Sequence, residues 1–183
     1  MDLVVGSISS MAKQEGKSIA ETFVSADLIV IVDTSGSMNT QDSANFQSRY
    51  DVACKELAAL QGSMPGKIAV LAFSDTVIFC PSGIPSNLSG GTDLSGALKF
   101  AKVADFPGMR FILISDGEPD DRDAALKIAK SYTNKIDVIY VGPETRPFGK
   151  EFLEKLATAS GGTLVTSDSA KQLAAGVRLL IGA

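Results

Sequence analysis

The chain of 183 residues contains no histidine, and this absence excludes several kinds of enzyme. The Ser-His-Asp and Cys-His nucleophile systems both need an imidazole base, and histidine is also the commonest protein ligand of zinc. Cysteine is scarce as well, because Cys54 and Cys80 are the only two and they lie far apart in the sequence beside apolar residues. We therefore expect two reduced core thiols rather than a disulfide or a catalytic thiol, as is usual in a reducing compartment.

An excess of basic residues and long apolar runs are also missing. The net charge of -4 and the isoelectric point near 4.8 argue against a nucleic-acid partner, which needs clustered positive charge. The longest wholly apolar run, Ile68 to Phe73, has six residues, whereas a helix needs about 20 to cross a bilayer. Met1 to Gly6 lacks the basic start and the long apolar middle of a secretion signal. We expect a cytoplasmic protein without a membrane partner.

What the sequence does contain is a series of short apolar segments that are typical of strands. The length and the 45% of hydrophobic residues suit one compact domain. Leu28 to Val32 is an unbroken run of branched apolar residues, which indicates a strand buried on both faces of a parallel sheet. The short Ser74-Asp75 spacer predicts a hairpin, and therefore one antiparallel edge strand. The other strands are predicted at residues 67–73, 76–80, 111–114, 136–141 and 163–166.

Between these strands, apolar residues three and four positions apart predict helices. Pro119-Asp120-Asp121 predicts the start of one helix, since proline fits a first turn and acidic groups face the positive end of the helix dipole. The predicted helices span residues 50–60, 94–101, 125–132, 152–156 and 173–181.

The alternation of strands and helices predicts the fold class. It is a doubly wound α/β fold with a mainly parallel six-stranded sheet, one antiparallel edge strand and helices on both faces. Residues 1–26 fall outside the alternation and are expected to form an arm, helical in part. Residues 27–182 would then be the domain.

Three polar motifs lie where predicted strands end or helices begin. They are Asp33-Thr34-Ser35-Gly36-Ser37, Gly90-Gly91-Thr92-Asp93 and Ser115-Asp116-Gly117. Because two of the motifs directly follow strands, we expect them at the carboxyl edge of the sheet, where open α/β sheets bind ligands. Carboxylates and hydroxyls are the donors that hard divalent cations such as Mg²⁺ prefer. The predicted metal ligands are Asp33, Ser35, Ser37, Thr92 and Asp116.

The same motifs resemble the metal-ion-dependent adhesion site of von Willebrand factor type A domains. The residues that carry the resemblance are Asp33-Thr34-Ser35-Gly36-Ser37-Met38, Gly91-Thr92-Asp93-Leu94 and Ser115-Asp116-Gly117-Glu118-Pro119. The resemblance covers residues 27 to about 182 in order and spacing, and includes all five ligand positions. For the fold, it implies the strand order 3-2-1-4-5-6.

For the mechanism, the resemblance implies a role for each ligand. Ser35 and Ser37 would contact the cation directly, and Thr92 would do so directly or through water. Asp33 and Asp116 would act largely through bridging waters or as outer ligands. One coordination position would stay open for an Asp or Glu side chain of a partner protein.

The resemblance thus implies an interaction module, not an enzyme, that uses Mg²⁺ or, alternatively, Mn²⁺ or Ca²⁺. Intracellular members of this family accompany AAA+ ATPases of the MoxR kind or serve in multi-subunit machines, so such an ATPase or a larger assembly is the expected partner. In adhesive members the last helix moves when ligand binds, and residues 170–181 are the corresponding segment here.

Other interpretations of these residues stay open. Serine and aspartate after a strand also make turns and helix caps, and we assign Asp93 to capping and Asp75 to a turn.

A haloacid-dehalogenase-like phosphatase also has an aspartate after its first strand, but its chemistry needs a second carboxylate where this chain has Ser35. A P-loop ending in Gly16-Lys17-Ser18 would need a glycine where the chain has Met11. A scaffold that keeps the motif but works without metal is a further alternative.

Overall fold

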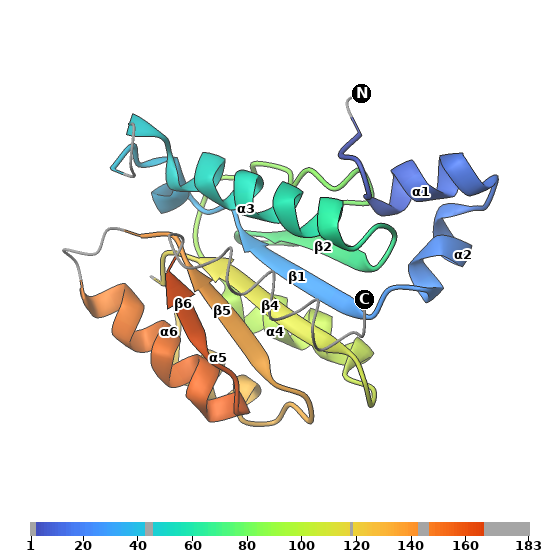
Figure 1. The fold of residues 1–183 in the computed structure, drawn as a ribbon. Helices are drawn as coiled ribbons and strands as arrows, with labels where there is room; N and C mark the ends of the chain where they lie inside the picture. The colour runs from blue at the N-terminus through green and yellow to red at the C-terminus, as the bar shows by residue number, and fades with distance from the viewer. Residues whose placement is uncertain (1–2, 43–45, 118, 143–146, 167–183) are drawn as a thin grey trace.

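A computed structural model describes residues 3–42, 46–117, 119–142 and 147–166. Its centre is a six-stranded sheet with the order β3-β2-β1-β4-β5-β6 (Figure 1). Only β3, which pairs with β2, is antiparallel to its neighbour. The predicted fold class and the strand order implied by the resemblance are therefore confirmed. The strands are β1 Leu28–Asp33, β2 Ile68–Phe73, β3 Val77–Phe79, β4 Arg110–Ser115, β5 Ile136–Tyr140 and β6 Leu164–Thr166.

β1 lies at the centre of this sheet because its side chains are apolar on both faces. It pairs in register with β2 on one side and with β4 on the other, so that Val32 lies beside Ala72 and Ile114. All its residues are buried. Since parallel neighbours end at the same edge, the registers also bring the residues that follow β1 and β4 together.

Helices cover both faces of the sheet (Figure 1). One core layer lies between α3 and the sheet and joins Leu57 of the helix to Val30 of β1. The second layer lies on the opposite face and joins Leu98 of α4 and Leu153 of α6 to Ile31 of β1. The helices of the domain are α3 Arg49–Ser63, α4 Leu94–Ala101, α5 Arg122–Ala129 and α6 Pro147–Ser160, with short 3-10 turns η1 Gly36–Asn39 and η3 Lys102–Ala104.

The start of α5 differs from the sequence prediction. The helix begins at Arg122, and the N-cap is Asp121, whose side chain accepts a hydrogen bond from the backbone of Ala124. Pro119 therefore lies outside the first turn. The reason is that Asp120 is drawn across to the neighbouring motif, where its carboxylate accepts a hydrogen bond from the Thr92 backbone at 2.9 Å.

Residues 3–26 contain two short helices, α1 Ile8–Glu15 and α2 Ile19–Val24. They lie beside the β3 edge, where the backbone N–H of Ser9 donates to the carbonyl of Pro81 at 2.8 Å. The ring of Phe23 packs edge-on against that of Phe79, with centroids 5.3 Å apart. The division at residue 26 stays a prediction. The predicted last helix at residues 173–181, and with it the expected movement of residues 170–181, lies outside the described residues.

The cysteines and the apolar segments bear on two expectations from composition. Cys54 and Cys80 are free thiols, as predicted, but only Cys80 lies in the core, because Cys54 is half-buried. Within the described part of the chain, no helix has both the length and the apolar character that crossing a membrane requires.

Candidate metal site at the carboxyl edge of the sheet

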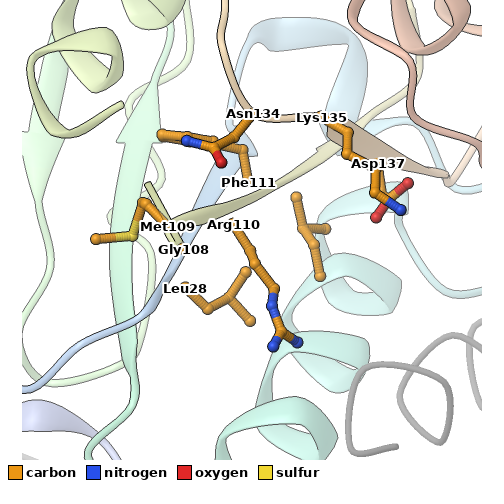
Figure 2. A pocket seen from close by; sticks show the side chains of 9 residues that line it. Leu28, Gly108, Met109, Arg110, Phe111, Asn134, Lys135 and Asp137 are labelled. Atoms are coloured by element: carbon orange, nitrogen blue, oxygen red, sulfur yellow. The ribbon is translucent and has the colours of Figure 1, made fainter. Parts of the chain in front are cut away.

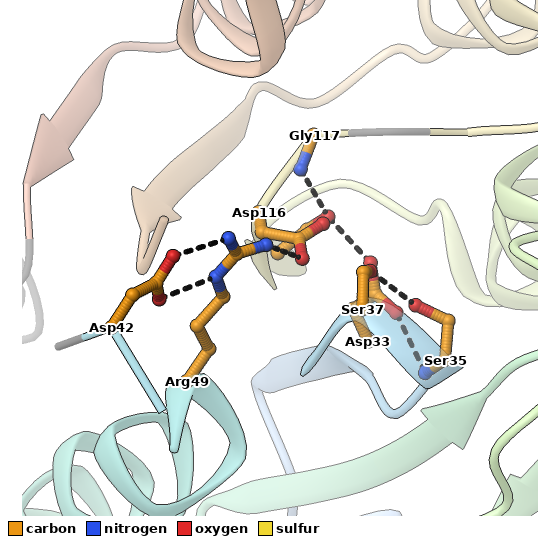
Figure 3. A network of polar contacts seen from close by, with 8 residues as sticks. Asp33, Ser35, Ser37, Asp42, Arg49, Asp116 and Gly117 are labelled. Carbon is orange, nitrogen blue, oxygen red and sulfur yellow. Dashed lines mark hydrogen bonds and ion pairs between the residues drawn. The ribbon is translucent and has the colours of Figure 1, made fainter. Parts of the chain in front are cut away.

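Asp33 and Asp116 lie at the same edge of the sheet because β1 and β4 are parallel neighbours. Asp33 ends β1, and Asp116 follows the last residue of β4, Ser115. The two aspartates are 0% and 2% exposed. The Ser115 hydroxyl donates to Asp33 Oδ2 at 2.7 Å, and it accepts from the Gly117 backbone at 3.0 Å (Figure 3). The sheet register thus positions two buried acidic groups that are far apart in the sequence.

The loop after β1 brings two hydroxyls to the same place. The backbone N–H of Ser35 donates to Asp33 Oδ1 at 3.0 Å, which turns the chain back over the strand end. The 3-10 turn that starts at Gly36 then places the Ser37 hydroxyl 3.2 Å from the Ser35 hydroxyl (Figure 3). The two serine side chains therefore lie on the same side of the loop.

A backbone hydrogen bond joins the motif that contains Thr92 to this loop. Gly36 N–H donates to the Gly90 carbonyl at 3.0 Å, and Thr92 is 6% exposed. Asp93 caps α4 by accepting from the Gly96 backbone at 2.8 Å, as predicted. Asp75 accepts from the Gly91 backbone at 3.1 Å and so supports the same loop. The motif with Thr92 therefore borders the polar group formed by the Asp33 loop and the residues that follow β4.

Gly117 lets the chain turn sharply after Asp116. Its φ of +84° lies in the left-handed region that glycine favours, and a Cβ there would lie 2.3 Å from the carbonyl oxygen of Gly149. The start of α6 is therefore packed closely against the chain beside Asp116. A side chain at position 117 would push these two segments apart.

Arg49 is a part of the site that the sequence analysis missed. It is the first residue of α3 and is 3% exposed. Its Nη1 lies 2.6 Å from Asp116 Oδ2, while Nε and Nη2 donate to the two oxygens of Asp42 at 2.9 and 2.7 Å (Figure 3). A basic residue at a helix start gives no signal that it pairs with an acidic residue 67 positions later. Only the tertiary structure identifies the contact.

The buried charges shift the protonation of these groups. Burial, and then the negative charge of Asp116, raise the pKa of Asp33 to about 6, although hydrogen bonds from Ser35 and Ser115 act in the opposite direction. Hydrogen bonding to Asp42, followed by that to Asp116, raises the pKa of Arg49, which therefore stays charged. The fixed positive charge of Arg49 therefore contacts Asp42 and Asp116, while Asp33 ionises less readily than an exposed carboxylate.

One buried oxygen of this group is unpaired within the described part of the chain. Asp116 Oδ1 is inaccessible to solvent and has no hydrogen-bond partner among the described residues. Buried carboxylate oxygens are normally paired, because an unpaired one loses its hydration without compensation. A cation, or water held by a cation, would satisfy this oxygen. The donor set of carboxylates and hydroxyls therefore fits a hard divalent ion.

The five predicted ligands are placed as follows. Asp33, Ser35, Ser37 and Asp116 belong to one polar group at the strand ends (Figure 3), and Thr92 lies in the loop that borders it. Among the residues that the structure describes, no cluster of three or more His, Cys, Asp or Glu side chains could hold a metal. The predicted set has only two carboxylates, and the remaining donors are hydroxyls. Metal binding by these residues stays a prediction.

The opposite end of the sheet carries a pocket of about 280 Å³. It lies at the amino ends of the strands and is lined by Leu28, Arg110, Lys135 and Asp137 among others (Figure 2). Ligands of open α/β sheets bind at the other edge. The polar group around Asp33 and Asp116 is therefore the better candidate site.

No protein-family model matches the sequence, and no curated protein matches it significantly. Solved structures do share the fold. An aerotolerance-related membrane protein from Bacteroides fragilis is 16% identical with a TM-score of 0.69, and the match covers 84% of this chain and 97% of that one. At such identities the likeness shows the fold alone.

Two further solved structures also share the fold at low sequence identity. The manganese-loaded TRAP protein of Plasmodium vivax is 17% identical with a TM-score of 0.56, over 81% of this chain and 71% of that one. A von Willebrand factor type A protein from Catenulispora acidiphila is 18% identical with a TM-score of 0.55, over 84% of this chain and 42% of that one. The six-stranded architecture is therefore that of von Willebrand A domains.

Proposed function

We propose that this chain, which has the von Willebrand A fold, is an interaction module that binds an Asp or Glu side chain of a partner protein through a divalent cation. The proposed ligands are Asp33, Ser35, Ser37, Thr92 and Asp116. The observation that carries the proposal is the buried Asp116 Oδ1, which lacks a hydrogen-bond partner among the described residues, beside a second buried carboxylate and two touching hydroxyls. Mg²⁺ is the proposed cation, with Mn²⁺ or Ca²⁺ as substitutes. The manganese in the Plasmodium vivax protein supports a divalent ion.

The side chains would have different roles in binding the cation. Ser35 and Ser37 would offer neutral hydroxyl oxygens, while Asp33 and Asp116 supply the negative charge that draws a cation to a buried position. When bound, the cation would supply a positive centre with a vacancy for an outside oxygen. Because hydroxyls leave much of its charge uncompensated, a carboxylate from a partner is the preferred occupant.

The proposal also covers catalytic activity, cellular location and the partner protein. The chain lacks histidine, the commonest general base, so we propose a module without catalytic activity. Two free thiols are in keeping with a cytoplasmic setting. There, a MoxR-type AAA+ ATPase or a larger assembly is the proposed partner, by analogy with proteins of the same fold.

The proposal is tested with a carboxylate probe. Binding of Mn²⁺ to the wild type is followed by water-proton relaxation, and glutarate is then added. We expect glutarate to displace bound water and lower the relaxation enhancement, whereas the neutral analogue glutaramide leaves it unchanged. Ser35→Ala is expected to weaken Mn²⁺ binding by at least tenfold, since it removes a direct donor. A wild-type protein that binds neither Mn²⁺ nor glutarate would contradict the proposal.

Cation binding should depend on pH through Asp33. Because the pKa of Asp33 is about 6 in the folded protein, its carboxylate is ionised at pH 8 and increasingly protonated below pH 6. A proton on Asp33 competes with the cation, so affinity falls as pH falls. We expect the dissociation constant for Mn²⁺ to be nearly constant above pH 7 and to rise about tenfold for each pH unit below 6. Calorimetric titrations at pH 5, 6, 7 and 8 measure this, and a constant affinity over that range would refute it.

A further inference from the structure

We propose that Arg49 is a built-in counter-cation of the candidate metal site, which weakens binding of the metal and strengthens attraction of the partner's carboxylate. This inference rests on the proposed function and adds a positioning residue that lies outside the three motifs. Arg49 is 3% exposed, and its guanidinium lies 2.6 Å from Asp116 Oδ2. The charge is therefore fixed directly beside one of the proposed ligands.

The geometry of the guanidinium explains why, among the described residues, only one of the two Asp116 oxygens has a partner. Two of the Arg49 nitrogens are held by the carboxylate of Asp42, which fixes the plane of the group (Figure 3). The remaining contact, from Nη1, holds Asp116 Oδ2. Asp116 Oδ1 is left buried and unpartnered among the described residues. Arg49 thus orients Asp116 so that one oxygen stays available to the site.

The charge of Arg49 has two consequences for a bound divalent cation. Asp33 and Asp116 alone would place two negative charges beside the cation. The guanidinium contacts Asp116 through Nη1 and Asp42 through Nε and Nη2, so it offsets part of the charge of Asp116 although Asp42 compensates part of its own charge. Interactions between charges are strong where burial excludes water. The cation is therefore held less tightly than the two carboxylates alone would hold it. For the same reason, it retains more positive charge toward an outside carboxylate.

A purely structural role for Arg49 makes a different prediction. The Asp42–Arg49–Asp116 bridge also ties the segment before α3 to the end of β4, and removing it would destabilise the protein. A structural bridge, however, gives no reason for the affinity for metal to increase when the arginine is lost. The direction of the change in metal affinity therefore separates the two roles.

The test compares Arg49→Met, which keeps the length but removes the charge, with Arg49→Lys, which keeps the charge. We expect Arg49→Met to bind Mn²⁺ about tenfold more tightly than the wild type, and its Mn²⁺ form to bind glutarate several-fold more weakly. Arg49→Lys keeps the charge but loses the planar guanidinium, so it should lie closer to the wild type than Arg49→Met does in both titrations. Equal or weaker Mn²⁺ binding by Arg49→Met overturns this inference. If the wild type binds no Mn²⁺, the proposed function itself fails.

A second variant keeps the inference testable if Arg49→Met does not fold. Asp42 is 30% exposed, so Asp42→Asn should be tolerated. It leaves the Arg49 charge without its main compensation and should weaken Mn²⁺ binding. Asp123→Asn is the matched control, because it removes an exposed carboxylate in the first turn of α5. A larger loss of affinity in Asp42→Asn than in Asp123→Asn supports the inference, and an equal or smaller loss overturns it.

Discussion

Replacing Asp33 by asparagine is expected to abolish binding of divalent cations and, at the same time, to stabilise the metal-free protein at pH 8. Asp33 is buried beside Asp116, and these surroundings raise its pKa from 3.8 to about 6. The folded state therefore favours the neutral form, and the unfolded state ionises more readily. An asparagine of the same shape removes the penalty of burying the charge, together with the charge that a cation needs.

The size and the pH range of the stabilisation follow from the shift in pKa. A raised carboxyl pKa means that the contribution of Asp33 to stability is fully present below about pH 4 and is lost as pH rises through about 6. At pH 8 the metal-free Asp33→Asn variant should be more stable than the wild type by up to about 3 kcal/mol, since each pKa unit corresponds to about 1.4 kcal/mol. Near pH 4 the two proteins should be equally stable.

Both halves of this prediction can be measured on the same preparations. Urea denaturation in the presence of EDTA gives the free energies of unfolding at pH 4 and pH 8, and calorimetry gives the affinity for Mn²⁺. The matched control is Asp123→Asn, an exposed position in the first turn of α5, which should bind Mn²⁺ like the wild type. Undiminished Mn²⁺ binding by Asp33→Asn would rule out the proposed site.

Truncating Phe111 should cause the largest loss of stability among the variants considered. Phe111 lies in β4, is 1% exposed, and packs edge-on against the ring of Tyr132 with centroids 4.9 Å apart. Removal of a buried phenylalanine ring costs about 3 to 5 kcal/mol, because apolar burial is lost and a cavity remains. The hydroxyl of Tyr132 donates to the Leu98 carbonyl of α4, so the same cavity loosens the contact between the sheet and that helix.

Phe100→Ala is the control for this prediction, because Phe100 is 50% exposed on α4. Its truncation should change the free energy of unfolding by less than about 0.5 kcal/mol, as is typical of surface positions. Urea denaturation of the two variants at one pH measures both values. Similar effects at positions 100 and 111 would show that the core is not packed around Phe111 as described.

Some elements of the fold were predicted correctly from the sequence, and others were not. The unbroken apolar run from Leu28 to Val32 predicted the central strand correctly, because such a run satisfies burial on both faces of a sheet. The cap at Asp93 was also predicted correctly. The start of α5 was placed too early at Pro119, because the carboxylate of Asp120 bonds to the Thr92 backbone, and such long-range pairing has no local signal.

The sequence by itself determined the alternation of strands and helices, and hence the sheet and the positions of the acidic and hydroxyl residues at strand ends. Periodicity and turn chemistry are local properties, so they can be read residue by residue. Only the tertiary structure decided that Arg49 contacts Asp116, that Asp116 Oδ1 is buried without a hydrogen-bond partner among the described residues, and that the pKa of Asp33 is raised. These properties depend on distances between segments and on the exclusion of water, and neither exists until the chain has folded.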